Sequence, residues 1–397
     1  MWEPVVAVEG GLGDVSEHFL AEGWSDGLPL VPPTRERVDA FLDYTDRDAT
    51  DVVGVMSPAG AEASIGSIAV NGVMAGCRPE YMPVLVALVE VMCDPMFRLH
   101  DAGATPGWEP VAVVSGPIVD ELDFNHEAGV MRVGRQANTT VGRFVRLFMR
   151  TVAGFRITPD ETDKGSIGFP FNVALAESPA TTDRLAWPSY GQDSGFAAGS
   201  DVVSLQSVVL SSGPMYTAGP DPRRHLDAIG TALGNMSRSW CVLGLARQSS
   251  HLLVVMSPIV ADLLARHGLT KQDISEHIHT VARISPWELE RCLWWHYGHR
   301  DFGDIVDQHH IANLSKYMPE LAEILPHESI DGDSRFAWSR DETVPIFPHP
   351  ESIRVVVAGD PGRNQTKGYL NNHLQGPNIA RPIVRPARWA ELRSRVS

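Results

Sequence analysis

Five stretches of this sequence repeat one pattern, in which a run of β-branched or other apolar residues ends in small residues and a proline. They are DVVGVMSPAG (51–60), PVAVVSGPIV (110–119), SVVLSSGPMY (207–216), HLLVVMSPIV (251–260) and SIRVVVAGDPG (352–362). Near-continuous apolar runs are typical of strands that are buried on both faces, and a proline is tolerated where a helix begins. Four of the five stretches are followed by a helical pattern. We therefore predict an α/β protein that is built from strand–helix units.

The length of 397 residues allows more than one hydrophobic core. We predict two packed lobes, 1–158 and 159–397, with mostly buried strands, covering helices and long loops at one end. Residues 179–200 are rich in Pro, Gly, Ser and Asp and are expected to form a long loop. A histidine-rich excursion of helices and loops is expected at about 295–350. Helices are expected at 34–44, 79–93, 222–236, 258–267, 271–282 and 286–297.

Charge and cysteine usage narrow the classes of partner and compartment. A formal net charge of −16 argues against nucleic acid or an anionic membrane surface as the main partner. The four cysteines form no CxxC pair and suit a reducing compartment. The longest strongly apolar run, Met82 to Met92, is too short to span a bilayer. No secretory signal is evident, so we expect a cytoplasmic protein, and we expect it to form a homo-oligomer.

The joint NGVMAGCRPEY (71–81) connects two apolar helical patterns and contains a candidate nucleophile. Cys77 and Arg78 stand just before the second helical run. A thiol near a helix N-terminus and beside a guanidinium group is expected to have a lowered pKa, which would make Cys77 a nucleophile or redox group. The alternative is a small buried cysteine at a tight joint, since cysteine is among the most buried residue types.

The stretch GRQANTTVGRFVRLFMR (134–150) contains a candidate anion site at the start of a helix. Asn138 or Thr139 is expected to cap the helix, and Arg135 precedes the cap. Arg143 begins a row of arginines along one helical face, continued by Arg146 and Arg150. Free helix amides and guanidinium groups suit a carboxylate or phosphate. The alternative is a surface stripe that pairs with the chain's own carboxylates.

Two further residues are candidates for proton transfer. His100, in LHDAGAT (99–105), lies in a loop before a buried strand, where it could be a general acid or base or a hydrogen-bonded loop histidine. Glu177 follows the apolar run FNVALA. Charged residues at strand ends often point into the sites of α/β proteins.

A metal centre is the main alternative to a thiol site. The stretch WWHYGHRDFGDIVDQHH (294–310) contains His296, His299, His309 and His310, which could bind Zn or Fe. The HExxH motif of metalloproteases is absent, and the aromatic residues also suit a packed interface. No motif in the chain requires a cofactor.

Several of these stretches together resemble one bacterial family. They are GWSDGLPLVPPT, AVNGVMAGCRPEY, LHDAGAT, GRQANTTVGRFVRL and VVVAGDPG, which occur here in the family's order and cover most of 15–285 and 352–362. The family comprises poorly characterised proteins associated with the UGSC (seleno)protein family. The resemblance implies thiol or selenol chemistry in a two-component system with a UGSC-type partner protein. This chain has no UGSC or CGSC string, so it would be the other component.

Taken together, these features predict an enzyme that acts on a small anionic, carboxylate-bearing molecule. Arg78, Arg135, Asn138, Thr139 and Arg143 would bind the anion, and Cys77, His100 and Glu177 would be catalytic. The reaction would be of lyase or hydratase type, or a thiol-dependent reduction. Two alternatives are a metal-dependent enzyme that uses the histidine cluster and a non-catalytic subunit of a two-component complex.

Overall fold

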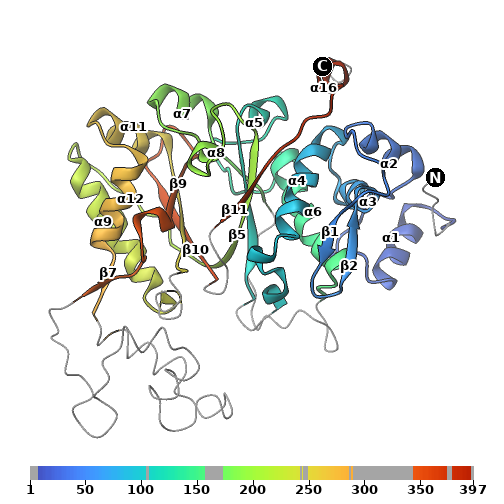
Figure 1. The fold of residues 1–397 in the computed structure, drawn as a ribbon, viewed down its shortest axis with the longest axis horizontal. Helices are drawn as coiled ribbons and strands as arrows, with labels where there is room; N and C mark the ends of the chain where they lie inside the picture. Colours follow the sequence, from blue (N-terminus) through green and yellow to red (C-terminus); the bar gives the residue numbers. More distant parts are fainter. Residues whose placement is uncertain are drawn as a thin grey trace, which may run out of the picture. The chain divides into compact units, whose positions relative to one another are not determined.

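The computed structural model describes residues 8–103, 107–156, 173–241, 244, 249–285, 288, 343–372 and 378–394. The fold is α/β, as predicted. The chain divides into two compact units (Figure 1). The first contains Met1–Val209, Val357–Pro361 and Asn378–Ser397, and the second contains Leu210–Val356 and Gly362–Pro377. This division differs from the predicted boundary at 158, because the chain leaves the first unit at Val209 and returns to it twice.

Most of the described helices lie in the first unit. They are α1 (Leu12–Ala21), α2 (Arg35–Leu42), α3 (Ile65–Ala75), α4 (Met82–Met92), α5 (Ile118–Glu121), α6 (Gln136–Phe148), α7 (Pro179–Leu185), α8 (Tyr190–Asp193) and α16 (Trp389–Ser394). Short 3-10 turns occur at η1 (Pro79–Tyr81), η2 (Pro95–Phe97) and η3 (Leu99–Gly103), and a π-helical turn, η4 (Met149–Ala153), follows α6. Because 179–200 contains α7 and α8, the prediction of one long loop there is wrong.

The strands of the first unit form a hairpin and part of a sheet. The hairpin pairs β1 (Val52–Met56) with β2 (Ala61–Ser64). In the sheet, β3 (Glu109–Ser115) lies parallel to β4 (Leu175–Ala176) and antiparallel to β5 (Val202–Ser211), and β11 (Ile379–Pro382) is antiparallel to β5. After its first residue β3 is buried throughout, as its apolar run predicts. Strand β1 does not fit that expectation, because Val55 is exposed.

The small residues of α3 explain how closely it packs on α2 and α4. A Cβ added to Gly72 would lie 2.6 Å from the ring of Phe41 in α2 and 2.8 Å from Leu85 in α4. Helix α3 also packs on α6. This helical layer carries the 71–81 joint against the start of α6.

The second unit contains the strand–proline–helix pattern in its expected form. Among its described residues the helices are α9 (Pro222–Ser237), α11 (Pro258–Arg266) and α12 (Lys271–Val281), with a 3-10 turn, η6 (Pro350–Ser352). Its strands run in the order β10 (Thr366–Asn371), β6 (Leu252–Met256), β9 (Ile353–Val357), and β7 (Arg283–Ile284) pairs with β8 (Val344–Pro345). Strand β6 ends before Ser257, which is the N-cap of α11, and Pro258 is the first helical residue. In the part of the chain that is described, no helix combines the length and apolarity needed to cross a membrane.

Candidate functional site

The thiol of Cys77 lies at the C-terminal end of α3 and not at the start of a long helix. Gly76 ends α3 in the left-handed conformation, with φ 82°. The backbone N–H of Cys77 donates to the Gly72 carbonyl at 3.0 Å, which closes the last turn of α3. Only the 3-10 turn η1 follows directly, and α4 begins at Met82. The prediction that the positive end of a helix dipole faces the thiol is therefore wrong.

The predicted low pKa of Cys77 is also wrong. Burial raises the pKa of the thiol from its usual 9.0 to about 12, although a hydrogen bond with Thr140 and the charge of Arg143 act in the opposite direction. Cys77 packs against the hydrophobic core of the first unit. A thiol with this pKa is protonated at neutral pH, so it is a poor nucleophile.

The joint and the start of α6 do meet, as the sequence hypothesis requires. Gln136, the first residue of α6, donates its Nε2 to the Gly76 carbonyl at 3.3 Å. The pKa of Tyr81 is raised from 10.0 to about 12, mainly because the phenol is buried. The charge of Arg78 acts to lower this pKa, whereas Glu80, Cys77 and Asp123 act to raise it. Arg78 and Asp123 therefore both lie within electrostatic range of the Tyr81 phenol.

The helix start itself is capped differently from the prediction. Arg135 is the N-cap residue of α6, so Asn138 and Thr139 lie inside the first turn. Asn138 is fully buried; its Nδ2 donates to the carbonyls of Asn125 and Ala174, each at 2.9 Å, and its Oδ1 accepts from the Asn125 N–H at 2.7 Å. The Oγ1 atom of Thr139 accepts a hydrogen bond from the Gly134 N–H. These two polar side chains hold the chain around the helix start and do not point to a free anion site.

Arg143 and Arg146 in α6, and Arg150 in the π-helical turn η4 that follows it, contact other parts of the first unit. Arg143 makes a two-pronged ion pair with Asp26, with both distances 2.8 Å, and also donates to the Pro29 carbonyl. The charge of Arg143 holds the pKa of Asp26 below its usual range although burial acts to raise it. Arg146 pairs with Glu109, and Arg150 donates to the Gly23 carbonyl. Arg143 and Arg146 are thus paired with the chain's own carboxylates, as the alternative interpretation expects, whereas Arg150 bonds to a backbone carbonyl.

Arg135 and Arg78 differ from that stripe because they are half-exposed. Arg135 uses only Nη1, which lies 3.0 Å from each oxygen of Asp123. Arg78 uses only Nη1, 3.5 Å from Glu80. Within the described residues, the Nε and Nη2 groups of both arginines have no hydrogen-bond partner. Their side chains are 50% and 51% exposed, so these donors are accessible.

The two predicted proton-transfer residues lie in contrasting environments. His100 is exposed in η3, with Nε2 3.4 Å from Asp101, and among the described residues nothing bonds it to the joint. Glu177 follows β4, as expected, but only 1% of it is exposed. Its Oε2 accepts from the Ser115 hydroxyl and from the Tyr190 N–H, each at 2.7 Å. Glu177 thus ties the end of β3 to the start of α8.

A pair that the sequence reasoning missed lies between β3 and α6. His126 places Nε2 3.1 Å from Oδ1 of Asp120 in α5, and its Nδ1 is buried without a hydrogen-bond partner in the described part of the chain. The carboxylate of Asp120 is 59% exposed. The Asp123 N–H donates to the Asp120 carbonyl at 3.2 Å, so the dyad shares one turn with the partner of Arg135. The signal available in the sequence was a histidine six residues after an aspartate in a loop that follows a buried strand.

The structure does not test the alternative of a metal centre at the histidine cluster. Its four histidines lie outside the described residues, and they are His296, His299, His309 and His310. Among the residues that the structure describes, no three His, Cys, Asp or Glu side chains gather in a way that could hold a metal ion.

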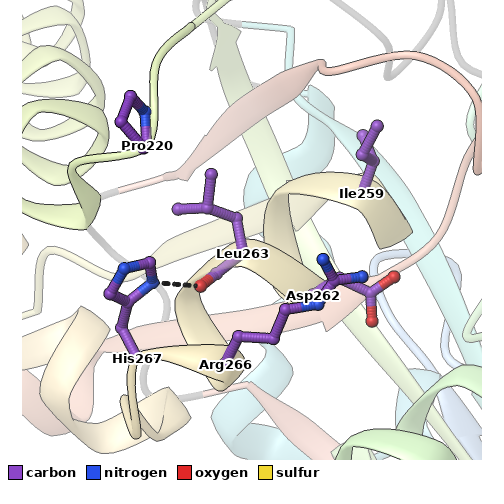
Figure 2. Close-up of a pocket in the computed structure, with 6 residues that line it drawn as sticks. All are labelled: Pro220, Ile259, Asp262, Leu263, Arg266 and His267. Atoms are coloured by element: carbon purple, nitrogen blue, oxygen red, sulfur yellow. Dashed lines mark hydrogen bonds between the residues drawn. The ribbon is translucent and has the colours of Figure 1, made fainter.

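A shallow hollow in the second unit holds none of the predicted site residues. It measures about 290 Å³ and is lined by Pro220, Ile259, Asp262, Leu263, Arg266 and His267 (Figure 2). His267 bonds through Nδ1 to the Leu263 carbonyl of its own helix at 2.9 Å. The exposed lining is largely apolar. The candidate site is therefore placed at the start of α6, around Arg135, Asp123, Asp120 and His126, and Arg78 is linked to it through Tyr81.

Comparison with known proteins adds nothing to this geometry, since no protein-family model, curated protein or solved structure matches the chain.

Proposed function

We propose that this protein is an enzyme that acts on a small anionic, carboxylate-bearing molecule by acid–base chemistry of the lyase or hydratase type. The observation that carries the proposal is the pair of half-exposed arginines, Arg78 and Arg135, which retain free guanidinium N–H groups. Guanidinium groups bind carboxylates through charge-assisted hydrogen bonds. The anion would replace water on these donors and leave the two existing ion pairs in place.

The His126–Asp120 pair supplies the proton-transfer group in this proposal. A carboxylate that is hydrogen-bonded to an imidazole orients the ring for proton transfer. Because Asp120 is mostly exposed, a proton can pass between the pair and a molecule at the surface. A thiol-dependent reaction at Cys77 does not fit this site, because burial raises the pKa of its thiol to about 12.

Anion binding is tested by thermal unfolding at low ionic strength with citrate, succinate, malate and phosphate. A ligand at about 100 times its Kd stabilises the folded protein by about 2.7 kcal/mol. We expect at least one carboxylate to raise the Tm of the wild type, and R78Q combined with R135Q to abolish the rise. R35Q is the matched control, because Arg35 is an exposed arginine paired with Asp39. If the double variant responds like the wild type, the arginine site is wrong.

Catalysis is tested by incubating the same carboxylates in D₂O and following exchange of the hydrogens next to the carboxylate by NMR. H126Q is expected to retain the anion-induced rise in Tm and to lose about 10²- to 10⁴-fold in exchange rate. H267Q is the control histidine. A wild type that binds anions but exchanges no hydrogen would favour the non-catalytic subunit instead.

A further inference from the structure

The end of the chain is tied to the elements that form the candidate site. Residues 378–394 return to the first unit, where β11 pairs with β5 and α16 follows (Figure 1). Arg385 pairs with Asp201 at 2.7 Å and with Glu121 at 2.9 Å. In α16, Trp389 donates its Nε1 to Glu121 at 3.1 Å. Glu121 is the last residue of α5 and is adjacent to Asp120, so this segment braces the helix that carries the dyad.

A second connection runs through Glu80. Its carboxylate lies 3.5 Å from Nη1 of Arg78 and 3.6 Å from Nη1 of Arg393 in α16. Only 4% of the Glu80 side chain is exposed, whereas the side chain of Arg393 is 27% exposed. A buried carboxylate is costly unless it is paired, and here two guanidinium groups share it.

The ion pairs of Glu80 with both Arg78 and Arg393 affect how strongly Arg78 can attract an anion. Arg393 offsets part of the negative potential that Glu80 creates around Arg78, so the surroundings of Arg78 attract an anion more strongly while Arg393 is present. If Arg393 were neutral, Arg78 would be the principal cation beside a buried carboxylate. Glu80 would then compete more strongly with an external anion for Arg78.

We propose that Arg393 and Glu80 are positioning residues that set how much of the charge of Arg78 is available to the substrate. The C-terminal segment thereby controls the affinity of a site to which it contributes no contact with the anion. The proposal rests on the proposed function in one respect, which is that the anion binds Arg78.

The two residues are expected to act in opposite directions on the citrate affinity, measured by calorimetry. R393Q should weaken citrate binding about threefold, and E80Q should strengthen it about threefold, as ion pairs of this exposure allow. A merely structural role predicts that both variants bind less tightly. R393K keeps the charge and should stay within twofold of the wild type. R388Q is the matched control, since Arg388 precedes α16 and forms its ion pair with the nearby Glu391. Weaker binding in E80Q, or unchanged binding in R393Q, overturns the proposal.

A second measurement separates this proposal from the proposed function. Hydrogen exchange of the backbone at 76–84 and 118–126 is followed by mass spectrometry without any anion. R393Q should speed exchange in both segments, because the Arg393 side chain also donates to the Glu121 carbonyl at 2.6 Å. R388Q should leave it unchanged. If the wild type binds no carboxylate, the proposed function fails, and exchange alone decides whether Arg393 braces these segments. Unchanged exchange in R393Q overturns the brace whatever the anion result.

Discussion

At the scale of single residues, Asn138 shows a polar side chain whose hydrogen-bonding groups are all used. It joins α6 to Asn125 in the preceding loop and to Ala174 just before β4. Leaving a buried donor or acceptor unsatisfied costs about 1–3 kcal/mol. The geometry of the candidate site therefore depends on this amide, although the amide itself is not exposed to a substrate.

The substitution N138D tests that dependence with almost no change in shape. Aspartate cannot donate to the two carbonyl oxygens, and its negative charge would face both of them. We expect a loss of about 2–4 kcal/mol in the free energy of unfolding, measured with urea. T139V, which removes a single accepted bond at a less buried position, should cost about 1 kcal/mol. Equal costs for the two variants would contradict this account.

The thiol of Cys77 allows a direct chemical test of its environment. With a pKa of about 12 the thiolate fraction at pH 8 is about 10⁻⁴, against about one tenth at the usual pKa of 9.0. Native protein should therefore react with iodoacetamide at Cys77 at least about 100-fold more slowly than urea-unfolded protein, as measured by peptide mass spectrometry. C77S should also leave the citrate response intact. Native labelling within tenfold of the unfolded rate would restore the nucleophile hypothesis.

The limits of sequence reasoning at this scale are clearest for the arginines of α6. A helix that carries Arg143 and Arg146 was predictable, because helical periodicity is local, but the π-helical turn that contains Arg150 was not. Their partners were not predictable, because Asp26 is 117 residues from Arg143 in the chain. The same holds for Cys77. Two apolar helical runs are visible in the sequence, but whether the thiol belongs to the end of the first depends on the left-handed conformation of Gly76.

At the scale of elements, the turn after β3 has the tightest backbone requirement in the candidate site. Gly116 has φ 109°, and an added Cβ would lie 2.5 Å from the Ser200 carbonyl oxygen and 2.8 Å from the Cα of Asp201. Both neighbours are backbone atoms and cannot move independently. Asp201 in turn accepts the Ile118 N–H at the start of α5. The turn therefore fixes the helix that carries Asp120.

G116A is expected to destabilise the protein by about 3 kcal/mol or more, because backbone strain and a backbone clash add. G134A is the matched control. Gly134 also has a positive φ, 141°, but has no atom within 4 Å of an added Cβ, so its cost should be limited to about 1–2 kcal/mol. The comparison is made by urea unfolding. A cost for G116A no larger than that for G134A would show that the turn can shift.

The elements themselves were largely predictable where local signals are strong. The helix expected at 271–282 is α12, and Thr270 caps its start by accepting the Asp273 N–H. Strand pairing was harder to predict. Uniform apolar runs suggest a helix-covered sheet, yet β3 is parallel to β4 and antiparallel to β5, which no local pattern specifies.

At the scale of the whole molecule, several shifted pKa values define the pH range of greatest stability. Burial lowers the pKa of His251 from 6.5 to about 4, with smaller contributions from Arg354 and His349. Burial raises the pKa of Tyr369 from 10.0 to about 12 and that of Cys93 from 9.0 to about 11, where Glu90 adds to the rise. These shifts link protonation to folding.

Whether stability rises or falls with pH depends on whether the folded or the unfolded state binds more protons. Below pH 6.5 the unfolded chain protonates His251 before the folded protein does, so stability falls as the pH drops toward 4. Above pH 9 the unfolded chain loses the Cys93 proton first, and above pH 10 the Tyr369 proton, so stability falls toward pH 12. Urea midpoints should therefore be highest between about pH 6.5 and 9. H251Q should flatten the acid side of the profile, and an unchanged acid side would contradict this assignment.

The return of the chain to the first unit has a consequence for synthesis on the ribosome. The strand that pairs with β5, Ile379–Pro382, and the helix that contacts α5 are translated only after the whole second unit. Until they emerge, β5 has an unpaired stretch of backbone along Val202–Leu205 that is open to pairing with other chains. Synthesis of the first unit thus begins before that of the second and is completed after it.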